Sequence, residues 1–372
     1  MGQPPVANPP NAYSQYPPPP QGPPGSGYGQ PPNNATNYSR PPPQGPPMGA
    51  PFNSGGPPGG APYGSMYTAN QANQDAQALR TAMKGFGTDE KAIINIVSQR
   101  TPEQIATLSH AYKANYGKSL ADAFRSETSG DFGYLLQGFA MPQPEFECKC
   151  IHNSIAGLGT DEDALIELVV GRSNSEMNNL KQCYRYMYNR DMEREIASDT
   201  SHNFKRLLVS LLQAGRDETQ QVYDTSADVE ALYRAGEKRF GTDEGAFISI
   251  ICTRSDAHLV QVFSQYQIKY GKPIQKVIKS EFSGDIERGL LSVVGYVQNR
   301  YEWAADQFEE SMRGFGTRED KLSRLTIRFR HPHLMPHVKQ AYQRKYGKSL
   351  YQRVHGETSG DYRRLLLASI GQ

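Results

Sequence analysis

Apolar side chains recur with a helical period from about residue 75 to the end of the chain. In the first such stretch Ala76, Leu79 and Met83 share one face, which predicts a helix buried along that face. Gly85 predicts the end of this helix, because glycine adopts the backbone angles of a helix C-terminus without strain. No segment shows a convincing strand pattern, so the sequence predicts an all-α protein.

Capping residues indicate where the following helices begin. Thr88 is predicted to cap a second helix. The Thr-Pro-Glu-Gln sequence at 101–104 has capping-box spacing with proline at the first helical position, and Gly117 is predicted to close this third helix. A short fourth helix and a fifth beginning near Asp131 complete a unit of five helices.

The five-helix unit occurs four times, and each copy carries two linked motifs. A Gly-x-Gly-Thr loop, with Arg239 replacing the first glycine in the third copy, is followed 42 or 43 residues later by an acid in a Ser/Thr/Gly-rich turn. Two motifs that recur together four times predict a repeat protein. The predicted organisation is a segment 1–68 followed by repeats at 69–141, 142–215, 216–298 and 299–372.

The N-terminal segment 1–68 has a different composition from the repeats. Of the 27 prolines, 21 lie in residues 1–65, and the only charged side chain before Asp75 is Arg40. Such a sequence has few aliphatic side chains to bury, so we expect a disordered tail, part polyproline II and part flexible coil. A solvated spacer and a segment for partner docking or self-association both fit this composition.

Charge and cysteine content narrow the class of protein. The residues from Asp75 onward carry 39 basic and 38 acidic side chains, which argues against a polybasic nucleic-acid-binding protein. No apolar run approaches the ~18 residues of a membrane span, and the N-terminus lacks the order of a signal peptide. Four cysteines give no disulfide framework, which predicts a cytoplasmic protein.

The loop and the acid together predict a calcium site. Ca²⁺ takes six to eight hard oxygen ligands, and glycines let a loop turn several backbone carbonyls toward one ion. The distal acids, Glu127, Asp199, Glu281 and Glu357, would add a carboxylate to each loop. One such loop alone is usually a helix–helix turn, but four copies in register with an acid favour a site.

The loop Lys84-Gly85-Phe86-Gly87-Thr88 with Glu127 resembles the annexin calcium loop and its distal acid. Residues 70–372 resemble a complete four-repeat annexin core, and the tail resembles those of long-tailed annexins. The resemblance implies a curved disc of four five-helix repeats with calcium loops on its convex face. It also implies calcium-dependent, reversible binding to acidic, phosphatidylserine-like phospholipid membranes, to which the cytoplasmic protein moves when calcium rises.

The resemblance also implies a ligand set of three carbonyls and one carboxylate in each repeat. The expected ligands are Met83, Gly85, Gly87 and Glu127; Ile155, Gly157, Gly159 and Asp199; Gly236, Arg239, Gly241 and Glu281; and Met312, Gly314, Gly316 and Glu357. The expected membrane contacts are Lys84, Phe86, Leu158, Phe240, Arg313 and Phe315. Repeat 2 departs most from the pattern, because Asp199 is shorter and His202 replaces the turn glycine, where we expect the backbone to need a positive φ. The sequence therefore ranks repeat 1 strongest and repeat 2 weakest.

The sequence is compatible with one alternative to membrane binding. A calcium-independent helical scaffold for protein partners is the alternative. An enzyme is not expected, since the sequence has no nucleophile–base motif and no Walker-type phosphate loop. Arg100, Arg172 and Arg254 recur just after the second helix of their repeats, where we expect them to bond helix-end carbonyls.

Overall fold

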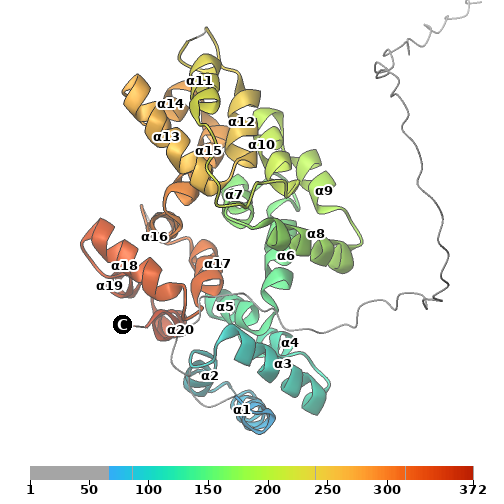
Figure 1. Cartoon of the computed structure of the whole chain (residues 1–372). Helices are drawn as coiled ribbons and strands as arrows, with labels where there is room; N and C mark the ends of the chain where they lie inside the picture. The colour runs from blue at the N-terminus through green and yellow to red at the C-terminus, as the bar shows by residue number, and fades with distance from the viewer. Residues whose placement is uncertain (1–66, 86, 239, 315, 372) are drawn as a thin grey trace, which may run out of the picture. The chain divides into compact units, whose positions relative to one another are not determined.

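The computed structural model describes residues 67–85, 87–238, 240–314 and 316–371, and within these ranges it contains twenty α-helices and no strand (Figure 1). The all-α prediction is therefore confirmed. The tail up to residue 66 and the loop residues Phe86, Arg239 and Phe315 lie outside the described residues. The predictions that concern them stay predictions.

Each of four successive segments contains five helices. The first has α1 (Ala69–Ala82), α2 (Glu90–Val97), α3 (Pro102–Tyr116), α4 (Leu120–Glu127) and α5 (Gly130–Ala140). The second has α6 (Gln143–Ser154), α7 (Glu162–Val169), α8 (Asn174–Tyr188), α9 (Met192–Asp199) and α10 (His202–Leu212). The third has α11 (Ser226–Ala235), α12 (Glu244–Thr253), α13 (Asp256–Tyr270), α14 (Ile274–Glu281) and α15 (Gly284–Gln298). The fourth has α16 (Arg300–Ser311), α17 (Glu319–Phe329), α18 (Met335–Tyr346), α19 (Leu350–Glu357) and α20 (Gly360–Ile370).

Most of the local signals lie where the sequence predicts them. The capping box of α3 is formed by Thr101 and Gln104, and Gly117 ends the helix with φ +70°. Two assignments are wrong. Helix α1 ends at Ala82, before Gly85, and the N-cap of α2 is Asp89, whose side chain accepts a hydrogen bond from the N–H of Ala92 at 2.9 Å.

The predicted role of the recurring arginines also needs correction. Arg100 pairs with Asp75 at 2.7 Å and Arg254 pairs with Asp228 at 2.7 Å, so both tie the end of the second helix to the first helix of the same segment. The hydrogen bond from Arg254 lowers the pKa of the Asp228 carboxyl. Arg172 keeps part of the predicted role, since it donates to the carbonyl of Leu168 at 3.0 Å while pairing with a glutamate of α6.

Helices far apart in sequence pack against one another to close the core. The first segment meets the fourth through α5 against α17 and α2 against α20, and the second meets the third through α7 against α15 and α10 against α12. The buried side chains include one tyrosine from the third helix of every segment: Tyr112, Tyr184, Tyr266 and Tyr342. One continuous apolar cluster therefore extends through all four segments.

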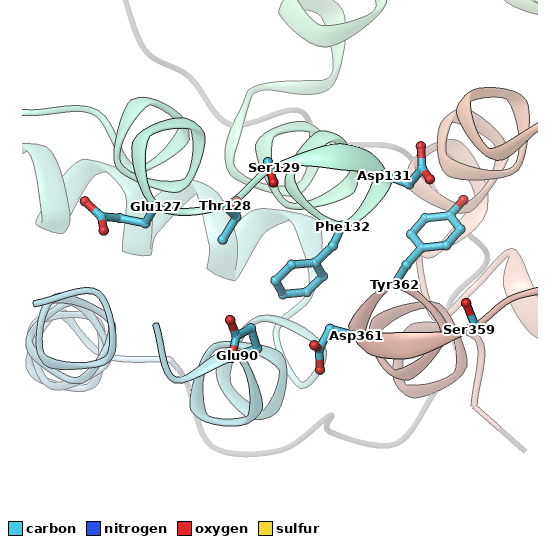
Figure 2. Close-up of a pocket in the computed structure, with 9 residues that line it drawn as sticks. All are labelled: Glu90, Glu127, Thr128, Ser129, Asp131, Phe132, Ser359, Asp361 and Tyr362. Atoms are coloured by element: carbon cyan, nitrogen blue, oxygen red, sulfur yellow. The ribbon is translucent and has the colours of Figure 1, made fainter. Parts of the chain in front are cut away.

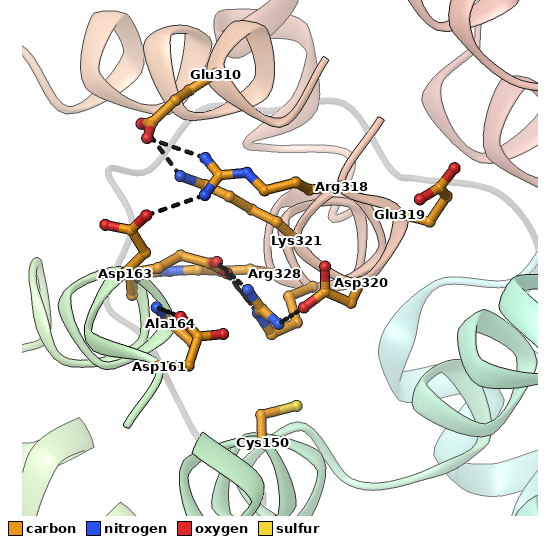
Figure 3. Close-up of polar contacts among 12 residues, drawn as sticks. Cys150, Asp161, Asp163, Ala164, Glu310, Arg318, Glu319, Asp320, Lys321 and Arg328 are labelled. Atoms are coloured by element: carbon orange, nitrogen blue, oxygen red, sulfur yellow. Dashed lines mark hydrogen bonds and ion pairs between the residues drawn. The ribbon is translucent and has the colours of Figure 1, made fainter. Parts of the chain in front are cut away.

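Polar contacts join the second segment to the fourth along α7 and α17. Arg324 donates to the Glu167 carboxylate at 2.8 Å, and both side chains are almost fully buried. Arg318 bridges Asp163 and Glu310, each at 3.0 Å, as Figure 3 shows. Burying charges is costly unless they are paired with good geometry, so the buried Arg324–Glu167 pair constrains how α17 lies against α7.

Candidate calcium-binding loops

Each Gly-x-Gly-Thr loop is closed by one backbone hydrogen bond. The N–H of the residue after the threonine donates to the carbonyl of the last residue of the preceding helix. The bonds are Asp89 to Ala82 at 2.9 Å, Asp161 to Ser154 at 2.8 Å, Asp243 to Ala235 at 2.7 Å and Arg318 to Ser311 at 2.8 Å. The third loop is one residue longer than the others. A turn closed by the same kind of hydrogen bond therefore forms in every repeat, with one additional residue in the third.

The glycines of these loops hold backbone angles that other residues rarely adopt. At the first glycine φ is +117° for Gly85, +105° for Gly157 and +104° for Gly314. The second glycines have φ values from +81° to +94°: Gly87, Gly159, Gly241 and Gly316. No atom lies within 4 Å of a Cβ built at any of these positions, so glycine is required for its backbone conformation and not to avoid a clash.

The carbonyl at the first ligand position comes from a helix C-cap. Met83, Ile155 and Met312 share nearly the same conformation, with φ between −104° and −115° and ψ between 2° and 8°. Gly236 in the longer third loop differs, with ψ −98°, and a Cβ there would lie 3.3 Å from Cγ of Glu281. The close approach of the acid explains glycine at this position.

The loop threonine joins each loop to its distal acid. In every repeat its hydroxyl Oγ1 donates to the backbone carbonyl of the acid, across 39 or 40 residues of sequence. The bonds run from Thr88 to Glu127 at 3.1 Å, Thr160 to Asp199 at 3.0 Å, Thr242 to Glu281 at 3.4 Å and Thr317 to Glu357 at 3.1 Å. The structure thus brings together the two motifs that the sequence linked only by spacing. We refer to this bond as the threonine clamp.

Two clamps also reach the carboxylate. Thr160 donates to Oδ2 of Asp199 at 2.6 Å, and Thr242 donates to Oε2 of Glu281 at 2.7 Å. Asp199 therefore reaches its loop although it is one methylene shorter than glutamate. Sequence reasoning missed the clamp because it treated Thr88 as a helix cap, and the one available signal was that threonine recurs at this position in all four loops.

The turn after each acid needs a positive φ. Its value is +59° at Gly130, +69° at Gly284 and +63° at Gly360, and His202 has φ +50° at the equivalent position. The structure confirms the expectation that a non-glycine residue is held in a left-handed conformation in repeat 2. This conformation costs about 1 kcal/mol or more for a residue with a Cβ.

The acid turns of repeats 1 and 4 line a shared acidic pocket of about 370 Å³. It is lined by Glu90, Glu127, Thr128, Ser129, Asp131, Phe132, Ser359, Asp361 and Tyr362. Figure 2 shows Glu127 at one edge of this pocket. The neighbouring carboxylates make the electrostatic potential near Glu127 more negative, which favours a cation over an anion there.

The chemistry of the loops fits a hard cation. Backbone carbonyls and carboxylates are the ligands that Ca²⁺ prefers. Among the described residues there is no cluster of three or more His, Cys, Asp or Glu side chains arranged to hold a metal, so the carbonyls would have to supply most ligands. Among the predicted calcium ligands that the structure describes, one backbone carbonyl already accepts a hydrogen bond. It is the carbonyl of Met312, and the donor is the side chain of Arg353.

Four five-helix repeats, each with a glycine loop clamped to an acid, define a helical repeat protein with surface loops suited to calcium. The sequence pattern of the family described as Annexin matches residues 74–138, 146–211, 227–293 and 303–369. The chain belongs to the annexin family. Membership supports calcium-dependent phospholipid binding at the level of the family.

Relatives and solved structures agree with this assignment. The chain is 42% identical to human annexin A11 over 300 residues, which is 80% of this chain and 59% of annexin A11. The structure of annexin III superposes with a TM-score of 0.78 at 35% identity, covering 81% of this chain and 94% of annexin III. A calcium-bound structure of annexin (Sm)1 gives a TM-score of 0.72 at 31% identity and covers 82% and 91% of the two chains.

Proposed function

We propose that this protein binds acidic phospholipid membranes reversibly when its loops hold calcium. The observation that carries the proposal is the threonine clamp, which places a carboxylate residue beside a glycine loop in all four repeats. The calcium-bound structure of annexin (Sm)1, solved on the same fold, supports it. None of the described helices is long and apolar enough to cross a membrane.

Each loop contributes oxygen ligands from its backbone and one carboxylate from the clamped acid. In repeat 1 the carbonyls of Met83, Gly85 and Gly87 and the carboxylate of Glu127 form the proposed set. The sets of the other repeats are Ile155, Gly157, Gly159 and Asp199; Gly236, Arg239, Gly241 and Glu281; and Met312, Gly314, Gly316 and Glu357.

One carboxylate per loop predicts modest affinity for calcium alone, on the order of 10⁻⁵ to 10⁻³ M. Ligand positions that the protein does not fill are available to a lipid phosphate, so calcium bridges protein and membrane. Calcium and membrane then raise each other's affinity by linkage, and several weak sites that engage one surface add avidity.

Exposed side chains on the loops would meet the membrane. Leu158 and Phe240, which stand between or beside the loop glycines, have relative exposures of 109% and 107%. Such exposed apolar side chains suit insertion into the interface of a bilayer. Lys84 and Arg313 are exposed next to the loops and would gain ~1 kcal/mol each near an anionic surface.

The proposed location is the cytoplasm, with recruitment to membranes when calcium rises. The tail is proposed to bind a protein partner or to self-associate. Deleting residues 1–65 removes no predicted calcium ligand, so calcium-dependent vesicle pelleting and the melting temperature should both persist while self-association or partner recruitment changes. A large fall in melting temperature would contradict this separation of roles.

The test of the proposed function is vesicle co-sedimentation. The full chain should pellet with phosphatidylserine vesicles in calcium and be released by a chelator. The combined change Glu127→Gln, Glu281→Gln and Glu357→Gln removes three of the four charged ligands at constant size and should strongly reduce pelleting at calcium concentrations that saturate the wild type. A control with Glu103→Gln, Glu218→Gln and Glu302→Gln loses the same charge outside the loops and should pellet normally.

Two results would count against the proposal. If vesicle binding by the triple loop variant depends on calcium as it does in the wild type, calcium does not bridge the loops to the membrane. Absence of vesicle pelleting, combined with chelator-insensitive capture of a protein partner, would favour the calcium-independent scaffold instead.

A further inference from the structure

An arginine occupies the predicted cation position in repeat 4. Arg353 lies on α19 one turn before Glu357, and its guanidinium contacts three acceptors. It donates to the carbonyl of Met312, to Oε1 of Glu357 and, at 3.2 Å, to Oε2 of Glu309. The first two acceptors belong to the proposed calcium ligand set. The side chain is largely buried, with 17% of its surface exposed.

The other three repeats have no cation at this position. The residues four places before the acids are Ala123, Glu195 and Val277. Ala123 and Val277 are buried and apolar. Glu195 is an acid, which accepts hydrogen bonds from Tyr184 at 2.6 Å and from Arg190 at 2.9 Å. Arg353 therefore distinguishes repeat 4 from the rest, although its loop has the same two glycines as the loops of repeats 1 and 2.

The guanidinium and a calcium ion compete for the same oxygens. A charged hydrogen bond to a carboxylate is among the stronger polar interactions, and Arg353 makes it with little solvent to screen it. Calcium bound to the Met312 carbonyl and the Glu357 carboxylate would stand beside a positive charge that cannot be deprotonated. Arg353 must leave both oxygens before the loop can take the ion.

Glu309 offers the displaced arginine an alternative partner. It already accepts from Nε of Arg353 at 3.2 Å and from the hydroxyl of Tyr342. Burial, together with the bond to Glu309, raises the pKa of Tyr342, so the phenol remains protonated and keeps Glu309 in place. Arg353 can thus rotate from Glu357 to Glu309 without losing its counter-charge.

We propose that Arg353 is an internal cation that closes the repeat 4 loop, so that repeat 4 takes calcium last and only at higher calcium concentration than repeats 1 and 3. This inference rests on the proposed function of the loops. Its consequence is a graded response, in which the first loops engage at low calcium and the fourth adds its contact when calcium rises further.

The test isolates repeat 4 in the full-length chain. A background with Glu127→Gln, Asp199→Asn and Glu281→Gln leaves Glu357 as the single proposed carboxylate ligand. Adding Arg353→Met removes the competing charge at similar side-chain length. Calorimetric titration with calcium should then reach half-saturation at a concentration about tenfold lower than the background alone, the factor expected for losing one charged competitor.

Control variants separate this effect from a general change of charge or stability. Arg344→Met removes an arginine of the same repeat that is exposed and pairs with Glu302, so it should leave the calcium titration unchanged. Arg353→Gln also removes the charge but keeps a polar side chain, and it should show the same gain in calcium affinity. It serves as the test variant if Arg353→Met lowers the melting temperature. Adding Glu357→Gln to Arg353→Met should remove the gain.

The outcomes distinguish this inference from the proposed function. If calcium binds the wild type but Arg353→Met and Arg353→Gln both titrate like the background, the competing role of Arg353 is overturned while the proposed function stands. If the wild type takes up no calcium with or without phosphatidylserine vesicles, the proposed function fails and this inference with it.

Discussion

Repeats 1 and 4 have the same loop backbone but different surroundings of the acid. Gly85 and Gly314 share φ values of +117° and +104°, and both loops carry the threonine clamp. Glu127 is exposed and its carboxylate accepts from its neighbour Ser126 at 3.3 Å, whereas Glu357 is paired with Arg353. Two loops that look equivalent in sequence therefore differ in how readily they would take a cation.

The comparison shows that the acid's own helix, and not the loop, distinguishes repeat 4 from repeat 1. Ranked by loop sequence, repeat 2 is weakest because of His202 and the shorter Asp199. In the structure Asp199 reaches Thr160 at 2.6 Å, while the equivalent carboxylate of repeat 4 is bound by a guanidinium. If Arg353 competes with calcium as proposed, repeat 4, intermediate in the sequence ranking, is expected to be the weakest.

The largest effect is expected when single acids are changed to amides. Glu127→Gln should raise the calcium concentration for half-maximal vesicle binding on the order of 30-fold, as expected for losing ~2 kcal/mol of charged ligand interaction. Glu357→Gln should raise it least of the four, because its loop is empty at the midpoint. Vesicle pelleting of each variant at a series of calcium concentrations measures how the four single changes rank.

The result at Asp199 decides between the two rankings. If Asp199→Asn has a smaller effect than Glu357→Gln, the ranking by loop sequence holds and the Arg353 competition is too weak to matter. A larger effect at Asp199 supports the ranking that the packing of α19 predicts.

An intermediate effect is expected from the loop glycines. Gly85→Ala forces an L side chain into φ +117° without any clash, which costs about 1 kcal/mol and should raise the calcium requirement of repeat 1 about fivefold. Gly314→Ala imposes nearly the same strain in repeat 4. Each variant is measured by isothermal titration in a background that retains only the acid of its own repeat. The calcium concentration for half-saturation should rise by a similar factor in both repeats. A marked difference between the two factors would mean that the two loop backbones are not equivalent.

The smallest effect is expected at the acid turns. His202→Gly relieves a left-handed residue at φ +50° and should raise the melting temperature by ~2 °C, while Gly130→Ala in repeat 1 should lower it by a similar amount. Thermal unfolding followed by circular dichroism measures both. Equal melting temperatures for His202→Gly and the wild type would show that the histidine turn carries no strain.

Features that depend on residues close together in the chain could be predicted from the amino-acid sequence. Helical periodicity, the capping box at Thr101 and the left-handed Gly117 follow from local backbone sterics and hydrogen bonding, so they could be predicted. Fourfold repetition of loop and acid at a spacing of 42 or 43 residues was sufficient to pair the two motifs. The same local logic predicted that His202 would hold a positive φ.

The side chains that meet across the packed helices could not be predicted in the same way. Thr88 could cap α2 on local grounds, but Asp89 does so, and Thr88 bonds the carbonyl of Glu127 39 residues away. Arg100 was assigned to helix-end carbonyls and instead pairs with Asp75. Arg353 lies one turn from Glu357 in sequence, yet its contact with Met312 exists only because α19 packs beside the end of α16. Such partners depend on the packing of whole helices, which local preferences do not encode.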